Sequence, residues 1–158
     1  MKLHPSLRIY AYSDPAKDQD LARLAAAYPV VPDGYFGLAS QATNITLLWN
    51  HRGELRIWGP DEILAMDAAH GASARMPGAM PFADNGGGQW LVHGEGVKGR
   101  GVYLVDTGSL DLDEYAPWVC ANLSELLIQA AGADLVFTSD PIDEAELGEP
   151  LYVDPPTL

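Results

Sequence analysis

The sequence predicts a single α+β domain in which helices flank a mostly antiparallel sheet. Three observations lead to this fold class. The segments 45–57 and 89–106 each contain two alternating apolar stretches separated by turn residues, which is typical of a β-hairpin. Helical apolar patterns precede the first hairpin and follow the second. The length of 158 residues, with 47% hydrophobic and 20% charged residues, fits one domain with its own core.

The elements expected in the first half follow from apolar spacing and from the positions of proline. Leu21, Leu24 and Ala25 fall on one helical face, and acidic residues occupy the first turn, where the helix dipole favours them. A second helix is expected to begin at Pro60, with Asp61 as its N-cap. In chain order, we expect a helix at 18–27, a helical turn at 32–36, strands at 45–49 and 55–57, and a short helix from 60.

The second half is expected to contain a loop, the second hairpin, an edge strand and a last helix. Asn122, with Glu125 three residues later, resembles a capping box, and Gly132 supplies the stop of that helix. Pro117 lacks the N–H needed inside a sheet, so its strand is placed at an edge. In chain order, we expect a loop at 70–80, strands at 89–93 and 101–106, an edge strand at 117–121, a helix from 122, and an acidic tail from about 133 to 158.

The net charge of −13 is distributed unevenly along the chain. Residues 1–101 carry 9 basic and 10 acidic side chains, whereas residues 102–158 carry 12 acidic side chains and no basic one. A field of that sign repels phosphate backbones and disfavours nucleic-acid binding, but it steers association with a basic partner. Simple solubility is an equally good explanation of the charge taken alone.

The cellular compartment is predicted from the lack of a membrane-spanning run, the lack of a secretory signal and the single cysteine. No apolar run reaches the ~18 residues of a membrane span, and no secretory signal is readable at the N-terminus. The lone cysteine, Cys120, has apolar and helix-forming neighbours that favour burial in the core over a catalytic role. We therefore expect a cytoplasmic protein that does not bind membranes.

The residue patterns that suggest chemistry have simpler structural interpretations. The four histidines are far apart in sequence, so a metal site is not expected. Asp111, Asp113 and Glu114 lack the glycine and glutamate of a calcium loop, which favours a solvated acidic turn. The glycines at 86–88 lack the Lys-Ser/Thr ending of a phosphate loop and are expected to form a turn. With no nucleophile, cofactor loop or metal set to name, we expect a protein without enzymatic activity and without a cofactor.

The sequence contains four motif segments, at 55–63, 77–88, 101–106 and 123–127. In their order and spacing, these segments resemble the SUKH superfamily, which includes the fungal cell-wall assembly regulators. The resemblance runs from about Leu21 to Gly132, and its most specific part is the stretch from Phe82 to Gly88 before a strand. Two departures are evident: 41–44 runs directly into a strand, where the family often has an Asn-Gly-rich loop, and the tail after Gly132 has no counterpart. The motif residues, to which we assign a structural role, are Trp58, Pro60, Phe82, Asp84, Gly86, Gly87 and Gly88.

The resemblance implies a helix-flanked antiparallel sheet and, in bacterial members, neutralisation of toxins delivered by neighbouring cells, many of them nucleases. Because fold does not fix function, this implication is an analogy. The leading hypothesis is an immunity protein that engages a basic toxin domain, and the alternative is a cytoplasmic regulatory scaffold that binds other proteins. The candidate partner-binding residues are Asp111, Asp113 and Glu114 in one turn, and Asp140, Asp143 and Glu144 in the tail.

Overall fold

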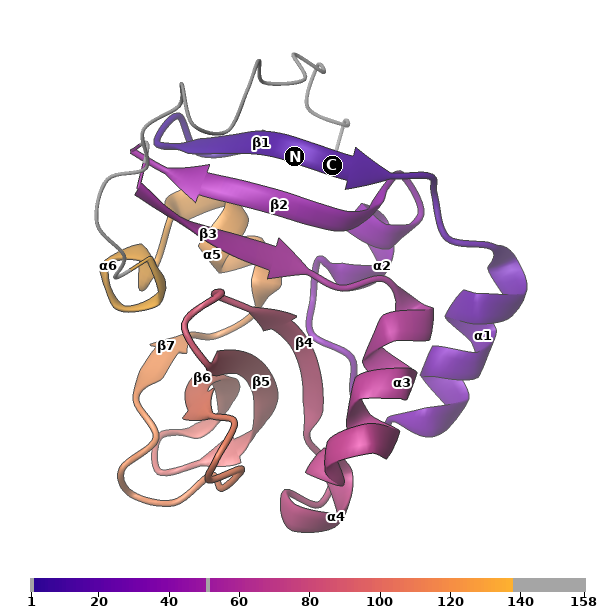
Figure 1. Ribbon diagram of the computed structural model, residues 1–158, viewed down its shortest axis with the longest axis vertical. Helices are drawn as coiled ribbons and strands as arrows, with labels where there is room; N and C mark the ends of the chain where they lie inside the picture. Colours follow the sequence, from indigo (N-terminus) through magenta and orange to yellow (C-terminus); the bar gives the residue numbers. More distant parts are fainter. Residues whose placement is uncertain (1, 51, 138–158) are drawn as a thin grey trace.

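The structure of the chain is a computed structural model that describes residues 2–50 and 52–137. Within these ranges, seven strands form one antiparallel sheet, and six helices accompany it (Figure 1). The order of the strands across the sheet, β1 to β7, is also their order along the chain. The predicted α+β class with a helix-flanked antiparallel sheet is therefore confirmed.

The element bounds are as follows. The strands are β1 (Leu7–Ser13), β2 (Thr43–Trp49), β3 (Arg52–Ile57), β4 (Met80–Asp84), β5 (Gln89–Gly96), β6 (Gly99–Asp106) and β7 (Trp118–Cys120). The helices are α1 (Asp18–Ala27), α2 (Tyr35–Ala39), α3 (Pro60–His70), α4 (Ala72–Arg75), α5 (Leu123–Gln129) and α6 (Ala133–Val136).

The helix at 18–27 and the first hairpin, β2–β3, are confirmed. Leu47 pairs with Leu55 across the hairpin, and both side chains are buried because the alternating pattern turns them to the core. The start of α3 differs from the prediction: Gly59 is the N-cap, and Asp61 lies within the first turn. The fixed φ of Pro60 suits the first helical position, so the N-cap lies two residues earlier than expected.

The segment predicted as a loop at 70–80 is largely ordered into regular structure, which corrects that prediction. The helix α3 continues to His70, α4 follows at once, and β4 begins at Met80. The carboxylate of Asp67 holds this region together, because it accepts hydrogen bonds from the backbone N–H of Ser73 (2.8 Å) and from the Tyr28 hydroxyl (2.5 Å). These contacts link α1, α3 and α4, which no local sequence signal indicates.

The second hairpin is longer and tighter than expected. The strands β5 and β6 extend to Gly96 and Gly99, so two residues form the turn in place of the predicted seven. The hydroxyl of Tyr103 accepts from Lys98 N at 3.0 Å and donates to Gly99 O at 2.7 Å. A Cβ atom added at Gly96 would collide with the Tyr103 ring, so this glycine is required by close packing.

The C-terminal elements are only partly as predicted. The Asn122 side chain accepts from Glu125 N at 2.9 Å, which confirms the cap, and β7 lies at the sheet edge as expected. The helix α5, however, ends at Gln129 with Ala130 in a left-handed conformation (φ 52°), and Gly132 is the N-cap of α6. Residues 133–137, which the sequence assigns to the acidic tail, pack into the core through Val136 and Phe137.

Candidate functional site

The loop 107–117 connects β6 to β7 and carries three of the predicted partner-binding residues. Asp111, Asp113 and Glu114 are all exposed there. The Asp113 side chain accepts the backbone N–H of Tyr115 at 2.8 Å, and its carbonyl accepts Ala116 N at 3.2 Å. In this turn the Tyr115 side chain points outward, and Tyr115 is 81% exposed to solvent. The predicted acidic turn is therefore present, and it presents an aromatic ring to solvent.

A cavity of about 320 Å³ lies between this loop and the end of β6. Its lining combines buried apolar residues of the strand with acidic residues of the loop and the strand end. The lining includes Leu104, Val105, Asp106, Asp111, Asp113 and Tyr115. Glu114 is a neighbour in sequence but is not part of the lining. The structure thus divides the predicted acidic cluster into two lining residues and one residue outside the cavity.

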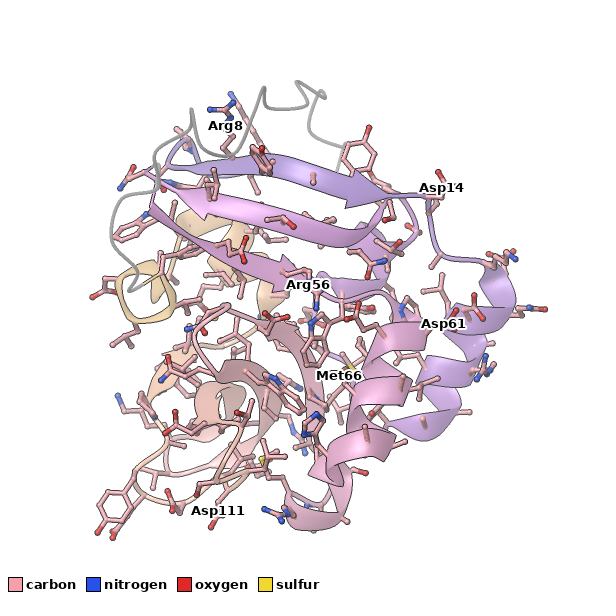
Figure 2. All side chains as sticks on the ribbon, viewed as in Figure 1. Arg8, Asp14, Arg56, Asp61, Met66 and Asp111 are labelled. Atoms are coloured by element: carbon pink, nitrogen blue, oxygen red, sulfur yellow. The ribbon has the colours of Figure 1, made fainter. Side chains whose placement is uncertain are left out.

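Asp106 and Tyr115 also belong to this site, and Arg75 is a neighbour of Asp111, although the sequence pattern did not indicate any of the three. A second cavity of about 340 Å³ is lined by Arg75 of α4 together with residues of the loop, Asp111 among them. Figure 2 shows Asp111 at the end of the molecule that also carries α4. Because α4 was not expected, no sequence signal could have brought these two residues together.

Some acidic residues before position 101, namely Asp20, Asp61, Glu62, Asp84 and Glu95, form described ion pairs, whereas none of the described later ones does. Every ion pair found in the described part of the chain joins residues before 101, such as Arg56 with Glu62 (3.0 Å) and Arg100 with Glu95 (3.2 Å). No described ion pair includes the later carboxylates, which are Asp106, Asp111, Asp113, Glu114, Glu125 and Asp134. Within the described ranges, these six carboxylates therefore lack the direct ion pairs that offset several of the earlier ones.

The remaining predicted partner-binding residues, Asp140, Asp143 and Glu144, lie outside the described residues. Their relation to the loop 107–117 stays a prediction.

The motif residues fall together at the junction of β3 and β4, where they have structural contacts. The indole N–H of Trp58 donates to Asp84 Oδ2 at 2.7 Å, and Arg56 Nε donates to the same oxygen at 3.3 Å. Trp58 and Phe82 are buried, and Trp58 N donates to Phe82 O at 2.8 Å. Pro60 opens α3 beside them. These contacts account for the motif through packing and hydrogen bonding.

The glycines at 86–88 form the turn between β4 and β5, as predicted. Asp84 Oδ1 accepts Gly86 N at 3.1 Å, and Asn85 Oδ1 accepts Gly87 N at 3.0 Å. Gly86 and Gly88 adopt positive φ values of 73° and 81°, which glycine tolerates without a Cβ clash. The backbone N–H groups of Gly86 and Gly87 therefore already have acceptors within the chain.

Cys120 and His93 are buried titratable groups. Cys120 is fully buried, as predicted, and burial together with the charge of Glu125 raises the pKa of its thiol to about 12. His93 of β5 is 4% exposed, and its Nδ1 atom has no hydrogen-bond partner. Burial, assisted by Arg100, lowers the pKa of His93. Both groups favour their uncharged forms near neutral pH.

Among the described residues, no group of three or more His, Cys, Asp or Glu side chains is arranged to hold a metal ion. None of the described helices has the length and apolar character needed to cross a membrane. Comparison with known proteins finds no family that matches the chain and no curated protein that matches it.

Proposed function

We propose that this chain is a non-enzymatic protein-binding domain of the immunity type, which acts in the cytoplasm on a basic toxin domain. The proposal takes its direction from the resemblance of the motif segments to the SUKH superfamily. It takes its chemistry from the acidic residues after position 101. A nuclease must be basic where it holds nucleic acid, and an acidic protein is suited to cover that surface.

The observation that carries the proposal is the absence of ion pairing for those acidic residues within the described ranges. Carboxylates that already pair with basic side chains contribute little field to an approaching partner. The exposed carboxylates of Asp111, Asp113 and Glu114 lie within four residues of one another and project from one loop. Such a group steers a basic partner during encounter and raises the association rate.

The test is the association rate between the chain and the product of a toxin gene adjacent to its own. Reversing Asp111, Asp113 and Glu114 to lysine is expected to slow association by about tenfold or more at low salt. Raising the salt concentration from ~0.1 M to ~1 M shortens the screening length from ~10 Å to ~3 Å and should remove most of that difference. Substituting lysine for Asp140, Asp143 and Glu144 measures how much the tail contributes to the association rate.

A control variant replaces Asp14, Asp18 and Asp61 with lysine, which changes the net charge by the same amount. These three residues are exposed at the α1 end of the molecule. Figure 2 shows Asp14 and Asp61 well away from Asp111. The control variant should associate faster than the loop variant, because distant charges act through more screening solvent. Equal rates for the unmodified chain, the loop variant and the tail variant would leave the acidity as a solubility feature and contradict the proposal.

A further inference from the structure

The cavity between β6 and the loop 107–117 has apolar as well as acidic residues in its lining. Leu104 and Val105 of β6 both line it, and because successive side chains of a strand point to opposite faces, one of the two contributes mainly its backbone. Ala116 and Pro117 complete the apolar part of the lining. At about 320 Å³, the cavity is at the lower end of the ~300–1,000 Å³ range of small-ligand sites. It therefore has room for the stem of one long side chain.

The rim of the cavity is acidic. Asp106 stands at the end of β6, and Asp111 and Asp113 stand on the loop. None of the three takes part in an ion pair within the described part of the chain. A cationic head group that follows an apolar stem would therefore meet carboxylates at the rim.

Tyr115 adds an aromatic surface to the same lining. It is 81% exposed, although aromatic side chains are usually covered. The turn held by Asp113 fixes its backbone, because Asp113 Oδ1 accepts the Tyr115 N–H at 2.8 Å. Tyrosine and arginine are both enriched among the residues that contribute most to binding in protein interfaces, and a guanidinium is attracted to the face of an aromatic ring.

We propose that this cavity anchors one arginine side chain of a basic protein partner, held between the Tyr115 ring and the carboxylates of Asp111 and Asp113. The inference rests on the proposed function, which supplies a basic protein as the partner. Arginine fits better than lysine because its planar guanidinium stacks on an aromatic ring and pairs with carboxylates through two parallel hydrogen bonds. Charge complementarity to Asp111 and Asp113, together with the exposed Tyr115 ring in the same lining, defines this occupant.

The probe is the tripeptide acetyl-Gly-Arg-Gly-amide, titrated into the full chain and followed by ¹H–¹⁵N NMR. We expect saturable shifts in the amide signals of residues 104–106 and 113–116, with a dissociation constant in the millimolar range. The peptide with lysine in place of arginine should bind about threefold more weakly, and the peptide with neutral citrulline should not saturate. Absence of saturable shifts in these residues, or equal binding of all three peptides, would overturn the proposal.

Matched variants separate the cavity from general electrostatics. Asp113→Asn removes one charge but keeps the Oδ1 acceptor for Tyr115 N–H, so the turn is retained. Glu114→Gln makes the same charge change on the neighbouring residue outside the lining. We expect Asp113→Asn and Tyr115→Leu each to weaken binding of the arginine peptide about threefold and Glu114→Gln to have little effect. Equal weakening by Asp113→Asn and Glu114→Gln would show attraction by net charge alone and overturn the anchor.

The two proposals fail in different experiments. If the arginine peptide does not bind the cavity but toxin association still depends on the loop charges, the anchor is wrong and the proposed function stands. If the peptide binds as expected but the rate of toxin association is unchanged in the charge-reversal variants, the proposed function is wrong. The cavity is then an arginine site for another basic protein.

Discussion

The indole N–H of Trp58 donates to Asp84 Oδ2 across 2.7 Å and joins two motif segments that lie 26 residues apart in the chain. The indole is buried, and its ring meets the Trp90 ring edge to face at a centroid distance of 5.0 Å. The same carboxylate accepts from Arg56 Nε and, through Oδ1, from Gly86 N. The Asp84 side chain thus connects Arg56 of β3, the indole of Trp58 and the glycine turn.

Asp84→Ala is expected to lower the free energy of unfolding by about 2–3 kcal/mol, because it leaves a buried indole N–H without an acceptor. Asp84→Asn keeps an acceptor and should cost less. Chemical denaturation followed by tryptophan fluorescence measures both values. Asp61→Asn serves as the control, because that side chain is exposed and its nearest cation is 3.7 Å away. A loss for Asp84→Ala no larger than that of the control would contradict the structural role of the motif.

The glycine turn allows backbone strain to be separated from steric contact. Gly88 has a φ of 81° with open space around it, whereas Gly87 does not have a left-handed φ. Gly88→Ala is therefore expected to cost about 1 kcal/mol of stability through strain alone, and Gly87→Ala should cost clearly less. Thermal or denaturant unfolding of the two variants is the measurement. Equal losses would mean that the turn in solution has a different geometry.

The burial of His93 predicts a pH dependence of stability. Its pKa is lowered in the folded chain, so between that value and the ordinary value of ~6.5 the unfolded chain binds more protons. This contribution to stability is present above about pH 6.5 and is lost as the pH falls toward the folded pKa. The slope from one such group is at most ~1.4 kcal/mol per pH unit.

Unfolding measured at pH 7.5 and at pH 5.5 tests this expectation. His93→Gln should show a smaller loss of stability between the two values than the unmodified chain. His70→Gln is the control, because His70 is exposed to solvent and its ring lies edge-on against the Trp90 ring. If His93→Gln keeps the full loss, other groups determine the acid sensitivity of the fold.

The elements predicted correctly from sequence are those whose signals are local. The helix at 18–27 has an apolar face and a proline after it, and the Asn122 cap acts within three residues. The strand β1 was missed because only Leu7 and Ile9 are buried and register shifts interrupt its pairing with β2. The strand β4 was missed because Pro81 and a further irregularity obscure its alternation, and long-range pairing with β5 determines its place.

The candidate site was predicted in part for the same reason. The carboxylates of the loop are visible in the sequence as a local excess of charge without basic neighbours. The cavity is not visible there, because it depends on β6 lying beneath residues that follow it by some ten positions. The exposure of Tyr115 is likewise a tertiary property, since aromatic residues are buried more often than not.

The identity between strand order and chain order has a consequence for how the molecule assembles. Each strand pairs only with the strands before and after it, so no strand has to enter a gap between two strands that are already joined. The β5–β6 hairpin has only two residues between its strands and has the most extensive register of the sheet. Pairing that begins there can extend outward one neighbour at a time, and each step closes one intervening segment. The longest of these segments, residues 14–42 between β1 and β2, contains α1 and α2, which shorten the distance that the last strand must cover.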